Sequence, residues 1–257
     1  MSARSLPEDP LSGQTLVAVT CPKRYRLNVT FEMAGADWDF VNKLHAAYRF
    51  QEQWPQGMLC HLTGIDNGTV VSQGIWTDEI AESAFFRDVA VGVITQAMHD
   101  FGVPEGDDGA VDFEPIARNI DRLIIGQLFA EFQDIGADLD STAIHQLGTE
   151  PVSLDTAFEG VSKQQLQDAT NALGLTRAAP EGLILLLNES GDDGPPHQSQ
   201  FWRSIDEAMS FWEYAFLPAL VDIGACTFDE QRFEPSIREL KRISVDSAEF
   251  DSAWRRA

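Results

Sequence analysis

His61 is the side chain of this sequence that is best suited to acid–base chemistry. It lies in the middle of the run "GMLCHLTG", residues 57–64, whose composition predicts a strand. Counting along that strand, His61 shares a face with Leu59 and Thr63, and we expect that face to line a half-apolar cavity inside a barrel. A neutral imidazole in such a cavity can take or give a proton near pH 7. His61 is therefore the candidate catalytic residue. The other interpretation is a structural histidine that is hydrogen-bonded to a neighbour.

Four further residues are candidates for binding a substrate. Residues 25–33 alternate between apolar and polar side chains, which is typical of a strand with two different faces. The polar face of this strand carries Asn28 and Glu32, either of which can orient the imidazole. Thr63 shares a strand face with the catalytic candidate. Trp76 ends another predicted strand, and we expect it to form a wall of the cavity, although packing in a core is the commoner role of such a residue.

Other common catalytic and metal-binding motifs are absent from the sequence. The five histidines form neither HxxxH nor HExxH, and the three cysteines form no CxxC pair. No GxSxG nucleophile motif, GxGxxG motif or Walker-type loop occurs, and the two GDDG stretches are too acidic to hold a phosphate. We therefore expect no metal and no cofactor, although a lone histidine would be enough to ligate a haem.

Two similar stretches predict that the chain contains two copies of one unit. They are "SQGIWTDEIAESAFF", Ser72 to Phe86, and "HQSQFWRSIDEAMSFW", His197 to Trp212. In each, a Trp ends an apolar run, an acidic helix start follows, and an aromatic pair closes ten residues after the Trp. A Phe-Glu-Pro tripeptide also recurs, at 113–115 and at 233–235.

Each copy has the element order β-α-β-β-α-β, the split βαβ arrangement of ferredoxin-like units. In the first copy we expect strands at 25–33, 57–64, 69–76 and 110–118, with helices within 34–57 and at 78–103. In the second copy we expect strands at 150–160, 181–190, 196–202 and within 230–240, with helices at 162–175 and 204–224. Helices cover only one face of such a sheet, so we expect the two sheets to bury their other faces against each other within the chain.

These elements divide the chain into five segments. We predict an N-terminal leader at 1–23, a first repeat at 24–120, a connector at 121–149, a second repeat at 150–243 and a C-terminal tail at 244–257. Because the sheet faces are then satisfied within one chain, we expect a monomer, or a dimer formed through surfaces other than the sheets.

The run "GMLCHLTG", the following Asn-Gly turn, "GIWTDEIAESAFF" and a helix that ends in Gly resemble the dimeric α/β-barrel superfamily. The chain is most similar to small actinobacterial members whose strand reads Gly, three apolar residues, His. The resemblance covers about 24–120 and, more faintly, 150–243. It implies an α+β fold in which two ferredoxin-like repeats form an intramolecular dimeric α/β-barrel.

The superfamily includes cofactor-independent quinol monooxygenases, polyketide cyclases, lactone isomerases, haem-dependent enzymes, aldoxime dehydratases and members without known activity. The resemblance therefore implies where a site lies and leaves the reaction open. Relatives often carry a His-Asn pair after the Pro of the last strand. This sequence has Arg118 and Asn119 there, which argues against a two-histidine site.

The composition excludes several classes of partner. The 257 residues carry a formal net charge of −23, which would repel nucleic acid and an anionic membrane surface. No stretch is apolar for long enough to span a membrane, and the N-terminus lacks the apolar core of a signal peptide. An odd number of widely spaced cysteines fits a reducing cytoplasm.

Two functions follow from these features. The first is a cofactor-independent lyase, isomerase, cyclase or monooxygenase that acts on a small apolar molecule, possible classes being aromatic or polyketide-like compounds. His61 would be its acid/base. The alternative is a non-catalytic protein that binds a small ligand or serves as a structural pseudo-dimer. The corresponding strand of the second copy, "LILLLNE", has Leu where His61 is expected, so only the first copy would carry a histidine site.

Overall fold

The structure is a computed structural model that describes residues 26–34, 38–49, 54–66, 69–100, 116–126, 138–139, 150–175, 178–190, 194–227 and 233–245. We call residues 26–125 the first half. Its elements are β1 (Arg26–Ala34), α1 (Trp38–Tyr48), β2 (Met58–Asp66), β3 (Thr69–Trp76), α2 (Glu79–Phe85), the π-helical turn η1 (Phe86–Ala90), α3 (Val91–Asp100) and β4 (Ile116–Ile125). The predicted leader, most of the connector and most of the tail lie outside the described residues.

The second half, residues 150–245, has the same order of elements. They are β6 (Val152–Ala157), α6 (Lys163–Ala172), β7 (Leu183–Ser190), β8 (His197–Trp202), α7 (Ile205–Phe211), the π-helical turn η2 (Trp212–Phe216), α8 (Leu217–Asp222) and β9 (Ser236–Val245). The short strand β5 (Asp138–Leu139) lies between the two halves in sequence and pairs with the end of β9.

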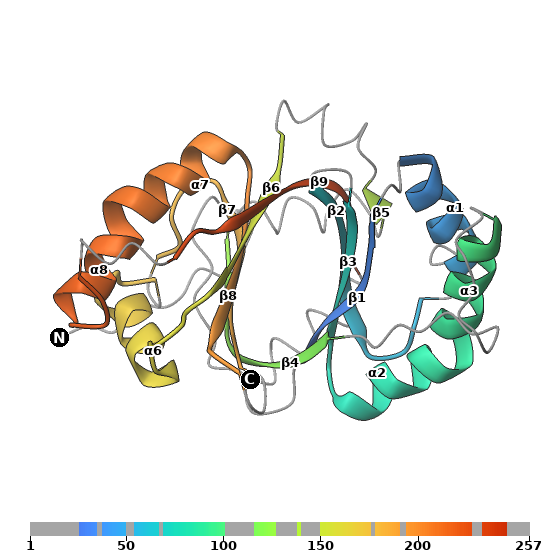
Figure 1. The fold of residues 1–257 in the computed structure, drawn as a ribbon, viewed down its shortest axis with the longest axis horizontal. Helices are drawn as coiled ribbons and strands as arrows, with labels where there is room; N and C mark the ends of the chain where they lie inside the picture. The colour runs from blue at the N-terminus through green and yellow to red at the C-terminus, as the bar shows by residue number, and fades with distance from the viewer. Residues whose placement is uncertain are drawn as a thin grey trace, which may run out of the picture.

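The strands form one antiparallel sheet that curls until its two ends meet. Hydrogen-bonded neighbours follow the order β2-β3-β1-β4-β7-β8-β6-β9, and β9 pairs in turn with β2. The halves therefore join at β4–β7 and at β9–β2, where the last strand of each half pairs with the second strand of the other. Figure 1 shows the strands as a ring, with α1, α2 and α3 outside one side and α6, α7 and α8 outside the other. The prediction of an α+β fold is confirmed, and the strands expected in two separate facing sheets are joined edge to edge into one curled antiparallel sheet.

Short polar side chains start the helices that follow the strands. Asp78 accepts a hydrogen bond from the backbone N–H of Ala81 at the start of α2, over 2.9 Å. Ser204 caps α7 in the same way, and Ser162 forms a reciprocal capping box with Gln165 at the start of α6. Each cap satisfies backbone donors that the first helical turn cannot pair internally. None of the helices in the described part of the chain is long and apolar enough to span a membrane.

The two halves also share two local irregularities. Gly57 and Gly182 precede β2 and β7 with φ of +81°, in the left-handed region that favours glycine. β2 and β7 then each carry a β-bulge one residue into the strand, between Met58 and Cys60 and after Leu183. A bulge adds one residue to one strand, so the alternation of side chains inverts beyond it.

Each half buries an apolar layer between its helices and the outer face of the ring. The first-half layer contains Phe40, Leu44, Tyr48, Met58, Trp76, Phe85, Phe86, Ala90, Ile94 and Ala97. The second-half layer includes Leu154, Phe158, Leu166, Leu183, Leu186, Trp202, Trp212, Phe216 and Leu220. The aromatic pairs noted in the sequence stand at the junctions of α2 with η1 and of α7 with η2 and belong to these layers. Both layers are cores, and their differences lie in the polar side chains that they contain.

Candidate functional site

His61 lies in the first-half layer, between the sheet and the helices. Its side chain is buried, and its Nε2 atom is 2.8 Å from the hydroxyl oxygen of Ser72 on β3. The ring of Tyr48, on α1, meets the imidazole edge-on with 6.3 Å between ring centroids. Contact with a helix that covers the outside of the ring places His61 on the helix side of β2.

The expectation that His61 and Thr63 line the inside of the barrel is therefore wrong. Unbroken alternation would place His61 opposite in orientation to Met58, which packs against the helices. The bulge that follows Met58 inserts one residue, so both side chains face the helices. Thr63, two residues further along β2, is also buried and pairs with Ser72.

Trp76, the expected wall of the site, lies in the first-half layer. It is buried against Phe85, with 5.2 Å between ring centroids. Its indole folds back over Gly74, so a Cβ atom at residue 74 would lie 2.6 Å from the indole Nε1. His61 pairs directly with Gly74 across β2 and β3. Side chains at directly paired positions are neighbours, which brings the indole N–H beside the imidazole.

The Trp76 N–H has no hydrogen-bond partner among the residues that the structure describes. Buried N–H groups are nearly always paired in folded proteins, and an unpaired one costs about 1–3 kcal/mol. The unpaired Trp76 N–H therefore lowers the stability of the fold. A bound molecule with an acceptor atom would pair this N–H and remove that loss of stability.

Asn28 and Glu32, the other predicted binding residues, lie on β1 next to β3. Their backbones pair with Gly74 and with Val71, respectively. Their side chains lie outside the described part of the structure, so their predicted roles stay predictions.

The second-half layer contains a continuous chain of hydrogen bonds in place of this arrangement. The indole N–H of Trp202 donates to Gln200 over 2.9 Å, and the amide of Gln200 donates to Gln198. Gln198 donates to Asn188 over 2.8 Å, and Asn188 donates to the hydroxyl of Thr170 over 3.1 Å. That hydroxyl donates to a backbone carbonyl within α6. Every member of this amide chain is buried.

Matching positions of the two layers show what differs. Counted through the paired strands, the matches are Trp76 with Trp202, Gly74 with Gln200, Ser72 with Gln198, Thr63 with Asn188 and His61 with Leu186. Gly74 has no side chain to accept from the Trp76 N–H, whereas Gln200 accepts from Trp202. The first-half layer thus has an ionisable imidazole and an unpaired donor where the second-half layer has neither. We call His61, Ser72, Gly74, Trp76 and Tyr48 the His61 site.

The chemistry available at the His61 site is proton transfer and hydrogen-bond donation. An imidazole can accept or release a proton, and the indole can only donate. Burial raises the pKa of Tyr48 well above its usual value, so this phenol stays neutral. Burial likewise raises the pKa of Cys60, which keeps that thiol protonated and unreactive. Within the described residues, no group of three or more His, Cys, Asp or Glu side chains could hold a metal ion.

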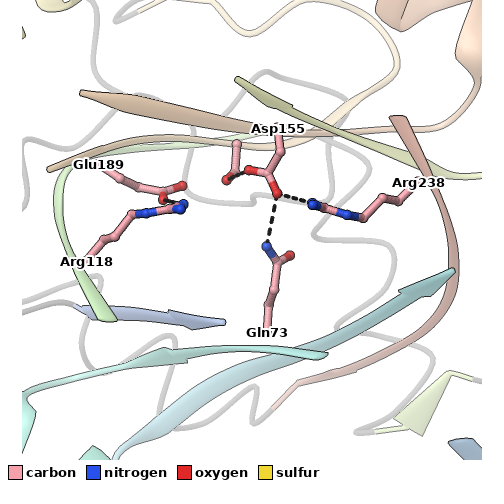
Figure 2. Close-up of polar contacts among 6 residues, drawn as sticks. Gln73, Arg118, Asp155, Glu189 and Arg238 are labelled. Atoms are coloured by element: carbon pink, nitrogen blue, oxygen red, sulfur yellow. Dashed lines mark hydrogen bonds and ion pairs between the residues drawn. The ribbon is translucent and has the colours of Figure 1, made fainter. Parts of the chain in front are cut away.

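A second polar cluster lies inside the ring. Figure 2 shows Gln73, Arg118, Asp155, Glu189 and Arg238 pointing from their strands into the space that the ring encloses. The Asp155 carboxylate accepts hydrogen bonds from Arg238, from Ser199 and, over 3.4 Å, from Gln73 of the first half. Arg118 of the first half reaches Glu189 of the second over 3.2 Å. The cluster therefore ties the two halves together.

Glu189 is a carboxylic acid of this cluster with a shifted pKa. Burial, and then the negative charge of Asp155, raise the pKa of Glu189 to about 7, while Arg118 and Ser199 oppose the shift. His197 pairs with Glu189 across β7 and β8 and is partly buried. Burial and the charge of Arg118 lower the pKa of His197, so this imidazole is neutral at pH 7.

This inner cluster was not predicted from the sequence. Arg118 and Arg238 each stand three residues after the Pro of a Phe-Glu-Pro tripeptide, so their repetition was a usable signal. Glu189 adjoins an acidic turn and resembled a turn residue. Gln73 lies within a largely apolar strand, where a single polar residue gives no sign of which face it occupies.

Comparisons with known proteins support the fold. No protein-family model matches the sequence, and no curated protein matches it. The structure is similar to that of a candidate monooxygenase from Fusobacterium nucleatum subsp. nucleatum, at 14% identity and a TM-score of 0.51, over 87% of this chain and 95% of the other. A candidate monooxygenase from Lactobacillus acidophilus is similar at 8% identity and a TM-score of 0.52, over 90% and 97%. These two show that the fold is shared, and identities this low carry no family and no reaction across.

Proposed function

We propose that this protein is a cofactor-independent enzyme that acts on a small apolar, aromatic or polyketide-like molecule at the His61 site. The observation that carries the proposal is the buried, unpaired N–H of Trp76, whose indole lies over Gly74, the residue that pairs with His61. The proposed site lies between the sheet and the helices, and not in the barrel where the sequence analysis expected it.

His61 would act as the base and Trp76 as the electrophilic donor. A substrate with an acidic C–H or O–H next to a carbonyl would lose its proton to the imidazole, leaving an enolate or phenolate. The Trp76 N–H would donate to the oxygen on which the negative charge develops, and such donors are most effective where water is excluded. The hydroxyl of Ser72 holds the imidazole in place over 2.8 Å. An enolate of this kind can isomerise, cyclise, eliminate a leaving group or react with molecular oxygen, so the class of reaction depends on the substrate.

The surrounding side chains favour a flat apolar substrate. Tyr48, Trp76 and Phe85 form one group of aromatic rings, with 5.7 Å between the centroids of Tyr48 and Phe85. Aromatic walls recognise ring compounds by area and by edge-to-face contact. The two structural relatives are candidate monooxygenases, which agrees with reaction with molecular oxygen as one outcome at such a site.

We also infer that the chain is a tandem-duplicated, actinobacterial-type member of the dimeric α/β-barrel superfamily. Three observations support this: the repeated order of elements, the matching bulges in β2 and β7, and the exchange of strand pairing between the halves. Two ferredoxin-like repeats that close one ring within the chain would need no second copy to bury their sheets. We therefore expect a monomer, or a dimer through other surfaces, in the cytoplasm. A small apolar molecule would be its partner, and nucleic acid and membranes would not.

Mass spectrometry of molecules that co-purify with the protein tests the proposed function. Native protein, the Gly74→Gln variant and the Gln200→Gly variant would be extracted and compared. A Cβ atom at residue 74 would lie 2.6 Å from the indole Nε1, so Gly74→Gln must displace the Trp76 indole. The variant should therefore fill the site and remove the ligand. Gln200→Gly alters the second-half layer and should retain it. A ligand that survives Gly74→Gln would place the site elsewhere.

A non-catalytic ligand-binding or structural role is the second candidate. The completed amide chain of the second-half layer favours it, because that chain shows that this layer can serve packing alone. A co-purified ligand that is recovered chemically unchanged after incubation with oxygen and water would support binding without turnover.

A further inference from the structure

We infer that the inside of the ring is a second binding site, for a small uncharged molecule that donates a hydrogen bond to Glu189. Neither the fold comparison nor the proposed function assigns a role to this cluster. The inference is independent of the His61 site, which lies on the other side of the sheet.

The first argument is an unused acceptor. The Glu189 side chain is fully buried. Its Oε2 atom accepts from Arg118, and its Oε1 atom has no hydrogen-bond partner within the described part of the chain. Asp155 differs, because Gln73, Ser199 and Arg238 all donate to it. A buried carboxylate oxygen without a donor is costly, and a ligand hydroxyl or amide N–H would satisfy it.

The second argument is the charge balance, which selects an uncharged ligand. Two carboxylates, Asp155 and Glu189, face two guanidinium groups, Arg118 and Arg238, so their formal charges cancel when Glu189 is ionised. A charged ligand would add a charge with no counter-ion in this buried setting, which is strongly unfavourable. Alcohols and primary amides donate hydrogen bonds without adding charge.

The third argument is access and complementarity. The side chains of Arg118, Asp155 and Arg238 remain 13–15% exposed, so the cluster is connected to solvent. His197, opposite Glu189, is also partly exposed, and its neutral ring can accept or donate a hydrogen bond. A primary amide, with a donor and an acceptor on one carbon, matches Glu189 on one side and either His197 or an arginine on the other.

Three probes of equal size and different charge test the inference: propionamide, propionate and propylammonium. None is aromatic, which avoids the ring-lined His61 site. Each would be titrated into the full chain at pH 8, where Glu189 is ionised, while the backbone amide resonances of β7 and β8 are followed by NMR. Propionamide should give saturable shifts near Glu189 and His197, and the two ions should not.

Matched variants locate the binding. Glu189→Gln replaces a charged acceptor by a neutral amide and should weaken propionamide binding by about tenfold. Glu159→Gln, on the exposed surface, should leave binding unchanged. The inference is overturned if no probe binds, if either ion binds more tightly than propionamide, or if Glu189→Gln has no effect. A crystal structure in which one ordered water occupies the Glu189 Oε1 atom and propionamide does not displace it would also overturn it.

Discussion

The two layers between sheet and helices have the same architecture and differ in how their tryptophans are satisfied. In the second half, Trp202 begins a buried amide chain that ends on α6. In the first half, the matching Trp76 covers a glycine and its N–H stays unpaired beside His61. Because the shared framework tolerates a complete chain, the incomplete one is not required by the fold. This difference is the reason to place function in the first half.

The inner faces of the two halves also differ, and here it is the second half that carries the additional ionisable side chains among the described residues. Glu189 and His197 of the second half match Gly64 and Val71 of the first when positions are counted through the paired strands. The second half thus places Glu189 and His197 inside the ring, and the first half places His61 outside it. The two arginines match each other, whereas both carboxylates come from the second half.

The largest expected effect comes from replacing His61 of the first-half layer by leucine, the residue at the matching position 186 of the second-half layer. His61→Leu should lower turnover of the substrate by about 10²- to 10⁴-fold, because the proposed general base is lost. The free energy of unfolding should change by only about 1 kcal/mol, the value of one buried hydrogen bond to Ser72. Steady-state kinetics and urea unfolding measure the two effects.

The control for this variant is Leu186→His, which adds an imidazole to the second-half layer without creating activity. A loss of stability above about 3 kcal/mol for His61→Leu, with turnover reduced only in proportion to unfolded protein, would make His61 a structural residue.

The second effect concerns the amide chain. Gln198→Leu removes the acceptor of Gln200 and the donor to Asn188 together, so unfolding should become easier by about 3 kcal/mol. Ser72→Ala, at the matching position of the first half, breaks a single bond to His61 and should cost about 1 kcal/mol. Urea unfolding of both variants checks the difference. Equal losses would mean that the two layers do not differ in the way described.

The third effect concerns pH and the inner face. Since the folded pKa of Glu189 is raised to about 7 from 4.5, the folded state binds more protons between these values. The stabilising contribution is therefore complete below about pH 4.5 and is lost as the pH rises through 7. The native protein should lose on the order of 2 kcal/mol more stability than Glu189→Gln between pH 5 and pH 8.

Unfolding curves at the two pH values, with Glu159→Gln as control, measure this difference. His197 titrates with the opposite sign, because its lowered pKa makes stability fall as the pH drops. It is present in all three proteins and cancels in the comparison. If the stability of native protein and that of Glu189→Gln depend on pH in the same way, the pKa of Glu189 is not raised.

The order of elements was predictable from the sequence because helix and strand periodicities, caps and turn glycines are local signals. The equivalence of Trp76 and Trp202 was predictable, because each residue ends an apolar strand at the same point of a repeated pattern. The side of the sheet that His61 occupies was not predictable, since a bulge after Met58 inverts the alternation without leaving a sequence mark. The inner cluster joins residues as distant as Arg118 and Glu189, and periodicity cannot register such contacts.

The state of the Trp76 indole N–H is the central claim, and NMR of the indole protons measures it most directly. The signals of Trp76 and Trp202 would be assigned by Trp→Phe variants in ligand-free protein. A hydrogen-bonded indole proton resonates downfield and exchanges slowly, so Trp202 should show both properties and Trp76 neither. Gly74→Gln places a Cβ atom 2.6 Å from the indole Nε1, so it must displace the indole and should shift the Trp76 signal. Gln200→Gly removes the acceptor of Trp202 and should move the Trp202 signal upfield. If Trp76 already matches Trp202 in the native protein and Gly74→Gln leaves it unchanged, the donor is satisfied within the fold and the proposed site loses its basis.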